Sequence, residues 1–183
     1  MSKTVLVPIA DGSEDIEAVT IIDILRRAGA DVTVASVDGL QVTMSRGIRI
    51  TADELIADCA ERTFDLIALP GGIPGAEHLR DSAILADMLK RQHREGRLYS
   101  AICAAPAVVL TPHGLLKDKK AASYPTFADK LENSQAAAIP VVEDGQAITS
   151  RGVGTAIPFA LKLTEKLFGP DKAREVAKSI VFV

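Results

Sequence analysis

Apolar residues follow two alternating patterns along the chain. Short, mostly apolar runs occupy residues 3–9, 31–37, 64–69 and 98–102, and runs of this length are typical of buried strands. Between these runs, mainly apolar residues recur at the i, i+3, i+4, i+7 spacing of an amphipathic helix: Ala18, Ile21, Ile22 and Leu25; Leu85, Met88, Leu89 and Gln92; and Ile157, Ala160, Leu161, Thr164 and Leu167. Strands that alternate with helices predict an α/β fold, a doubly wound sandwich around a mostly parallel sheet.

Polar residues and glycines mark where these elements begin and end. Ser13 is expected to cap the first helix, because acidic residues follow it in the first turn, and Gly29 ends that helix. Ser82 is expected to cap the second helix. The remaining segments predict a hairpin at 41–44 and 47–51 with Ser45-Arg46 at its bend, a helical connection at 53–59, a strand at 120–123, a loop or strand entry at 134–138, a hairpin at 139–142 and 146–150, and a short last helix after Gly169-Pro170.

Cys103 lies where the strand at 98–102 is expected to turn into a helix at 104–110. Pro106 falls in the first turn of that helix, where a missing N–H costs nothing. A sharp strand-to-helix turn resembles a nucleophile elbow, here with sulfur in place of the hydroxyl. It needs small neighbours, and the chain has Ala101, Ala104 and Ala105. Helix N-terminal amides favour a thiolate, so this placement predicts a lowered Cys103 pKa. The alternative interpretation is a buried structural thiol.

Three glycine-rich turns are expected at the same edge of the sheet as Cys103. Gly12, Gly71-Gly72 and Gly152 each follow a predicted strand, and ligands of doubly wound sheets bind beyond the carboxyl ends of the strands. Glycines there leave backbone N–H groups free to bind an anion, although plain tight turns need them too. Neither a dinucleotide fingerprint nor a P-loop accompanies them, and no His spacing suggests a metal site. We therefore predict no cofactor and no metal.

A reactive thiol needs a partner that exchanges protons with it. His78, His93 and His113 are expected on surfaces or loops. Glu14 and Glu17 instead follow the first strand, at the edge where Cys103 lies. A buried carboxyl is pushed toward its neutral form and could donate to sulfur. Their spacing does not show which of the two acids is the partner. The alternative is that both only stabilise the N-terminus of a helix, as acidic residues in a first turn often do.

Length, charge and composition narrow the classes of function. The 183 residues fit one domain, 1–183, and a net charge of −3 with 4% aromatic residues argues against nucleic-acid binding. No apolar run approaches the ~18 residues of a membrane helix, and no signal-peptide pattern precedes the first strand. The two cysteines, Cys59 and Cys103, form no CxxC pair. We expect a cytoplasmic protein that binds neither membranes nor nucleic acid.

Four ordered motifs resemble the ThiJ/PfpI superfamily, within it the branch of the Parkinsonism-associated deglycase and its bacterial relatives. They are Ala-Asp-Gly-Ser-Glu-Asp-Ile-Glu-Ala at 10–18, Leu-Pro-Gly-Gly at 69–72, Ala-Ile-Cys-Ala-Ala-Pro at 101–106 and Thr-Ser-Arg-Gly-Val-Gly-Thr at 149–155. The resemblance covers roughly residues 4–177. It implies a flavodoxin-like sandwich, a homodimer and an oxidation-prone cysteine.

The resemblance also implies roles for single residues. Cys103 matches the reactive cysteine and Glu17 the acid that hydrogen-bonds it. Gly71, Gly72 and Ala104 match backbone donors around the substrate oxygen. Tyr124 stands where the human-type branch carries a histidine, and could add a hydroxyl to the site. Positions that match dimer contacts are Asp23, Arg26, Arg27 and Arg46.

Three functions follow from this resemblance as hypotheses. The first is a cysteine-dependent, glutathione-independent glyoxalase acting on small reactive aldehydes, with a related deglycase activity on glycated amino groups. The second is a redox-sensing stress protein or chaperone whose cysteine is oxidised to the sulfinate. The third, an amidotransferase-like hydrolase, needs a histidine that the sequence does not place. Peptidase activity is not expected, because Ala104 stands where the protease-like branch has a histidine.

Overall fold

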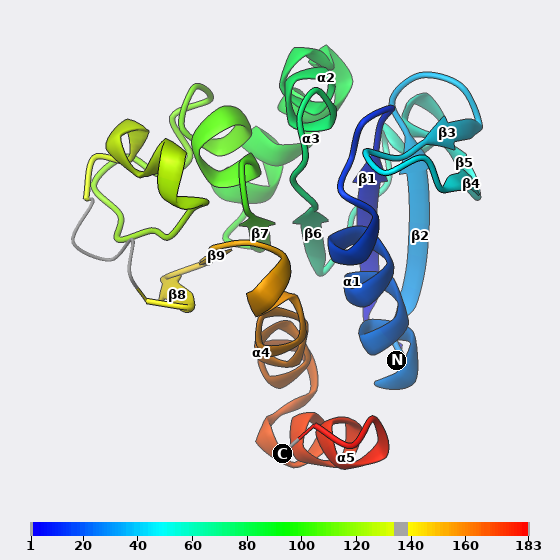
Figure 1. Ribbon diagram of the computed structural model, residues 1–183, viewed down its shortest axis with the longest axis vertical. Helices are drawn as coiled ribbons and strands as arrows, with labels where there is room; N and C mark the ends of the chain where they lie inside the picture. The colour runs from blue at the N-terminus through cyan, green and yellow to red at the C-terminus, as the bar shows by residue number, and fades with distance from the viewer. Residues whose placement is uncertain (1, 134–138, 183) are drawn as a thin grey trace.

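The computed structural model describes residues 2–133 and 139–182 and contains a seven-stranded central sheet (Figure 1). Every neighbouring pair in it is parallel except the last, which is antiparallel. In spatial order the strands are β5 (Glu54–Leu55), β2 (Asp31–Ser36), β1 (Thr4–Ile9), β6 (Leu66–Leu69), β7 (Leu98–Ile102), β9 (Ala147–Ser150) and β8 (Val141–Asp144). The predicted mostly parallel, flavodoxin-like α/β sheet is confirmed.

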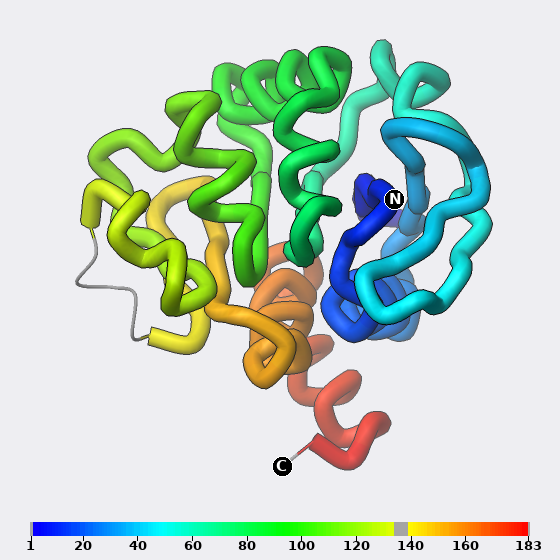
Figure 2. The backbone as a smooth tube through the Cα atoms, turned by 45° about the horizontal axis from the view of Figure 1, so that its top comes forward, coloured from blue at the N-terminus to red at the C-terminus, as the bar shows by residue number. Residues whose placement is uncertain are grey.

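Helices cover both faces of this sheet, as a doubly wound sandwich requires. Alternate β1 residues enter different cores: Val5 and Val7 pack with α1 (Asp15–Arg27) and α4 (Ala156–Phe168), whereas Leu6 packs with α2 (Gly75–Asp81) and α3 (Ala83–Arg94). The last helix, α5 (Pro170–Ser179), lies at one end of the molecule against α4, as both views show (Figures 1 and 2). No helix in the described part of the chain is long and apolar enough to cross a membrane.

Two hairpins agree with the sequence. The first pairs β3 (Gln41–Thr43) with β4 (Arg49–Thr51) as a separate two-stranded sheet, and its bend contains Ser45 and Arg46. The second pairs β8 with β9 at the sheet edge. The prediction for residues 134–138 lies outside the described residues.

Two predictions of secondary structure differ from the structure, one helix was not predicted, and one residue of a predicted inner helix face lies outside it. Residues 53–59 form an edge strand and a 3₁₀ turn, Ile56–Cys59, because Glu54 and Leu55 pair with β2. Residues 120–123 form no strand, since their amides bond side chains: Lys120 N–H donates to Asp144 and Ala122 N–H to Thr149. The helix α2 was not predicted. Nor is Ile157 an inward residue, because α4 instead buries Ala156, Phe159 and Leu163 beside the predicted Ala160, Thr164 and Leu167.

The start of α1 also differs from the expectation. Ser13 does not cap the helix, because its Oγ accepts the Ala10 N–H within the preceding turn, at 3.0 Å. Glu14 is the N-cap, and its Oε2 accepts the Glu17 N–H at 2.8 Å. This cap fixes the backbone of the first helical turn, and with it the direction in which the Glu17 side chain leaves the helix.

Candidate active site

Cys103 occupies a sharp corner at the carboxyl end of β7. Its backbone φ is +64°, a left-handed value that residues other than glycine rarely adopt. Two hydrogen bonds hold the corner: the Cys103 N–H donates to the Ser150 carbonyl at 3.1 Å, and the Tyr124 N–H donates to the Cys103 carbonyl at 2.7 Å. The predicted elbow is therefore present, although the segment after it, Pro106–Leu110, is a π-helix rather than an α-helix.

Glu17, and not Glu14, is the carboxyl that accompanies the sulfur. Its side chain is fully buried, and its Oε2 accepts the Gly71 N–H at 2.9 Å. Its other oxygen, Oε1, is buried and has no ordinary hydrogen-bond partner among the described residues. The Cys103 thiol interacts with this carboxyl. Glu17 is thus anchored through one oxygen and keeps the other available for a proton.

The two groups influence each other's ionisation. Burial raises the pKa of Glu17 to about 7, against the lowering effect of its bond from Gly71. Burial and the charge of Glu17 raise the pKa of Cys103 to about 12. The predicted lowering of the Cys103 pKa is therefore wrong: the amides of Gly72 and Ala104 do act in that direction, but burial and the neighbouring carboxylate outweigh them. The carboxyl ionises before the thiol, so Glu17 can accept the thiol proton.

The glycine turn before α2 brings its backbone against the elbow. A Cβ on Gly71 would lie 2.6 Å from the Cys103 Cβ and 3.0 Å from the Ala104 nitrogen, so only glycine fits there. Gly72 has φ +89°, and its amide and that of Ala104 act to lower the pKa of the Cys103 thiol. The N–H of Gly71 donates to Glu17 instead, which leaves Gly72 and Ala104 as the amides that face Cys103.

Cys103 opens into a cavity of about 750 Å³ at the carboxyl edge of the sheet. Glu14, Ser45 and Arg46 line it from the α1 side. Its other lining residues are Gly72, Ile73, Ala104, Tyr124, Pro125, Phe127, Arg151, Gly152, Val153, Gly154 and Thr155. A volume within the ~300–1,000 Å³ of small-molecule pockets fits a ligand larger than a three-carbon aldehyde. The sequence did not single out Ser45 or Arg151 as site residues, although both lie in motifs it noted.

Tyr124 forms part of the cavity wall. Its side chain is 45% exposed, and its ring packs against Gly152, where a Cβ would lie 3.3 Å from the ring. No histidine is among the lining residues of the described chain. His78 and His113 contact the carbonyls of Asp11 and Arg80, and His93 lies beside Tyr99. The expectation that histidines stay outside the site agrees with this geometry.

Comparison with known proteins identifies the family of this chain. The model of the DJ-1/PfpI family matches residues 3–166. The chain belongs to the DJ-1/PfpI family. The resemblance inferred from the four motifs is thereby confirmed.

Individual members of the DJ-1/PfpI family are similar over nearly the whole chain. Protein DJ-1 homolog A of Arabidopsis thaliana is 50% identical over 98% of this chain, which spans about half (47%) of that relative's length. A solved structure titled "Toxoplasma gondii DJ-1, oxidized" has 49% identity and a TM-score of 0.97, with both chains covered completely. A Caenorhabditis elegans relative named glutathione-independent glyoxalase DJR-1.2 is 36% identical over 98% of this chain and 95% of its own.

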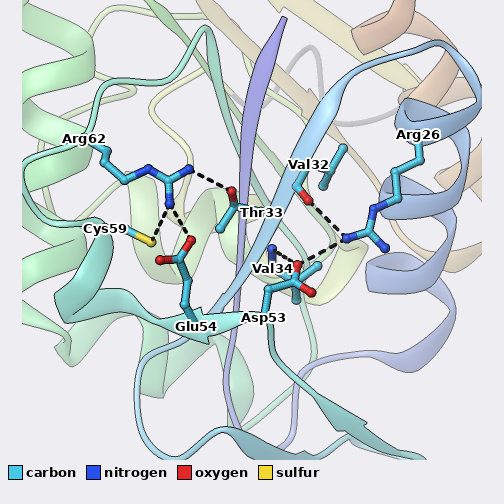
Figure 3. A network of polar contacts seen from close by, with 8 residues as sticks. All are labelled: Arg26, Val32, Thr33, Val34, Asp53, Glu54, Cys59 and Arg62. Atoms are coloured by element: carbon cyan, nitrogen blue, oxygen red, sulfur yellow. Dashed lines mark hydrogen bonds and ion pairs between the residues drawn. The ribbon is translucent and has the colours of Figure 1, made fainter. Parts of the chain in front are cut away.

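The second cysteine has a different environment from Cys103. Cys59 is fully buried beside Arg62, whose guanidinium also contacts Glu54 and Thr33 (Figure 3). Burial and the nearby Glu54 charge raise the Cys59 pKa to about 11. It has no share in the cavity around Cys103. Cys59 is therefore an internal control for any reaction of Cys103.

The residues matched to dimer contacts lie on two exposed elements. Arg27 and Asp23 form an ion pair on α1, with 2.6 Å between Nε and Oδ2. Arg46 lies in the β3–β4 bend and lines the cavity. Ile16 and Val19 on α1 are 55% and 47% exposed, and large apolar side chains at such positions favour an interface.

Proposed function

We propose that the protein is a cysteine-dependent, glutathione-independent glyoxalase that converts α-oxoaldehydes such as methylglyoxal to hydroxy acids. The observation that carries the proposal is the pairing of Cys103 with the buried Glu17 at the base of a cavity. Family membership and the name of the nematode relative add support.

In the first step, the sulfur of Cys103 adds to the aldehyde carbon. The C–S bond forms as the carbonyl π bond breaks, and the thiol proton passes to the carboxylate of Glu17. The amides of Gly72 and Ala104 stabilise the negative oxygen. Glu17 then returns the proton to that oxygen, which gives a neutral hemithioacetal and a free carboxylate.

In the second step, Glu17 moves a hydrogen between the two substrate carbons. Its carboxylate removes the proton from the sulfur-bearing carbon, which gives an enediolate, and Glu17 returns that proton to the neighbouring carbon. The hydroxyl proton of the sulfur-bearing carbon passes to the neighbouring oxygen, so that a C=O remains beside the sulfur. The product is a thioester of Cys103. Water hydrolyses it, releasing the hydroxy acid and restoring the thiol, so that the net reaction consumes one aldehyde and one water. Glycated amino groups would follow the same steps, with the amine as an additional leaving group.

Turnover by the purified protein tests this proposal. Methylglyoxal should disappear without added glutathione and a hydroxy acid should accumulate, and Cys103→Ala should abolish both changes. Cys59→Ala is the matched control, because it removes the other sulfur from a buried position away from the cavity. Full turnover by Cys103→Ala would refute the proposal.

A second candidate is a redox-sensing stress protein or chaperone in which Cys103 is oxidised to the sulfinate. The cavity-facing sulfur beside a proton-bearing Glu17 favours it, because such a carboxyl can donate to a sulfinate oxygen. Peroxide treatment followed by mass spectrometry distinguishes the two. Stoichiometric sulfinate on Cys103 in a protein without measurable aldehyde turnover would favour the sensor.

A further inference from the structure

Asp15 is a buried carboxylate that the catalytic steps above do not use. It is the first residue of α1 and is 2% exposed. Three donors from the β3–β4 bend converge on it: the Ser45 hydroxyl at 3.0 Å and the Arg46 N–H at 2.8 Å on Oδ2, and the Ile48 N–H at 3.2 Å on Oδ1. One side chain therefore binds three residues of the bend.

The bend that Asp15 holds is a wall of the Cys103 cavity. Ser45 and Arg46 line the cavity, whereas Asp15 itself does not. A main-chain bond from Ser45 N–H to the Ser13 carbonyl, 2.8 Å long, joins the same two segments. The first turn of α1 thus carries Glu17 toward the sulfur and fixes the opposing wall through Asp15.

A carboxylate suits this position better than an amide of the same size. The three donors need acceptors on both oxygens, and an ionised carboxyl group presents only acceptors. The amide group of an asparagine would turn its NH₂ toward either the Ile48 N–H or the Arg46 N–H. At least one bend amide would then lose its partner while remaining next to another donor.

We propose that Asp15 is a positioning residue that sets the wall against which the side group of the α-oxoaldehyde binds. The inference rests on the proposed function. A cavity of about 750 Å³ leaves room beyond the two reacting carbons, with Ser45 and Arg46 on the wall that Asp15 holds and apolar Ile73, Phe127 and Val153 elsewhere around it. Substrates with a bulky side group fill this room and depend on the position of the wall, whereas glyoxal, which has no side group, does not reach it.

Kinetics with phenylglyoxal and glyoxal test the inference. Asp15→Asn should raise KM for phenylglyoxal by about fivefold to tenfold, as expected for losing one or two hydrogen bonds of the wall, while kcat and the constants for glyoxal stay near wild type. The matched control is Asp65→Asn: Asp65 also accepts a main-chain N–H, from Thr4, but at the amino end of β1. Asp65→Asn should leave KM and kcat for both aldehydes unchanged. An equal change in KM for phenylglyoxal and for glyoxal in Asp15→Asn would overturn the inference.

A second readout does not depend on turnover. Alkylation of Cys103 by N-phenylmaleimide, divided by its rate with iodoacetamide, measures the room beside the sulfur. The ratio should change at least about threefold in Asp15→Asn and not in Asp65→Asn, since the bulky reagent contacts the wall. Ser45→Ala, which removes one of the three donors, should give a smaller change in the same direction and replaces Asp15→Asn should that variant not fold.

The two readouts separate this inference from the proposed function. A wild-type protein without turnover of either aldehyde refutes the glyoxalase proposal, and the alkylation ratio then decides on Asp15 alone. A ratio that is unchanged in both Asp15→Asn and Ser45→Ala would show that Asp15 does not set the wall.

Discussion

The N–H of Gly71 donates to Oε2 of Glu17 across 2.9 Å, and the same glycine lies against the Cys103 elbow. One residue therefore touches both members of the proposed catalytic pair. Because its amide is engaged by the carboxylate and its α-carbon faces Cys103, Gly71 fixes the acid and the sulfur relative to each other.

Replacing Gly71 by alanine should disrupt the site. The new methyl group would lie 2.6 Å from the Cys103 Cβ and 2.9 Å from the Ile102 carbonyl oxygen, so the elbow must shift. We expect Gly71→Ala to lower the unfolding free energy by about 1–3 kcal/mol, as overpacking does, and to reduce turnover. Gly154→Ala is the matched control, because it lines the same cavity and its Cβ would meet nothing within 4 Å. Denaturant unfolding compares them, and equal stability of the two variants would contradict this account.

The raised pKa of Glu17 makes stability depend on pH. The folded protein holds this proton more tightly than the unfolded chain, so the contribution is complete below the ordinary value of 4.5 and is lost as the pH rises through about 7. The difference corresponds to about 3 kcal/mol. Glu17→Gln should therefore gain stability relative to wild type between about pH 5 and pH 8.

Urea titrations at several pH values measure this effect. Asp65 should change stability with pH in the opposite direction. Its hydrogen bond from the Thr4 N–H and its pairing with Lys3 hold its pKa below 3.8, against the effect of burial. The stability from Asp65 is present above that value and is lost as the pH falls. A Glu17→Gln variant whose stability ran parallel to wild type across the range would show that Glu17 ionises normally.

The reactivity of Cys103 should follow the ionisation of Glu17. Alkylation by iodoacetamide should show a first rise with a midpoint near pH 7, because the carboxylate accepts the thiol proton only once it is ionised. Glu17→Gln should abolish this rise, and Cys59 should stay unreacted in both proteins, since it is fully buried. A Cys103 rate that climbs only above about pH 8 in wild type would exclude Glu17 as the base.

We propose that the protein is a homodimer that uses α1 and the β3–β4 bend, with Asp23, Arg27 and Arg46 at the contact. The exposed Ile16 and Val19 on α1 support the proposal. Sedimentation should give twice the 19.4 kDa of one chain at micromolar concentration. Val19→Glu should shift the protein toward the monomer, because it places a charge in an apolar contact. A wild-type monomer would contradict the proposal.

The sequence predicts the fold and the position of Cys103 because both follow from local patterns. Short apolar runs, glycine turns and the small residues around Cys103 each indicate their own conformation, and the parallel sheet then brings the turns to one edge. The choice of Glu17 over Glu14 came from the family resemblance and not from spacing. In the structure the choice depends on a long-range contact, the bond from Gly71, which no local pattern contains.

The wrong predictions also result from contacts between residues that are distant in sequence. The sign of the Cys103 pKa shift depends on how far the sulfur is buried and on the charge of a residue distant in sequence, whereas the elbow motif reports only the nearby amides. The sequence of residues 120–123 is typical of a strand, but the N–H groups of Lys120 and Ala122 donate to the side chains of Asp144 and Thr149 instead of to a neighbouring strand. Asp15 has the appearance of an ordinary acidic residue in a helix N-terminus, and only the folded hairpin shows what it binds.

The most direct test of the Cys103–Glu17 pair is methylglyoxal turnover by Glu17→Gln at about pH 8. Glutamine keeps a donor near the sulfur but cannot take and return a proton. Acid–base steps are worth about 10²–10⁴-fold, so turnover should fall by that factor relative to wild type, while Cys103 of the variant is still alkylated at a pH high enough to ionise the thiol without Glu17. Turnover by Glu17→Gln at the wild-type rate would contradict the account, because it would show that neither the addition of the thiol nor the proton transfer between the two carbons needs Glu17.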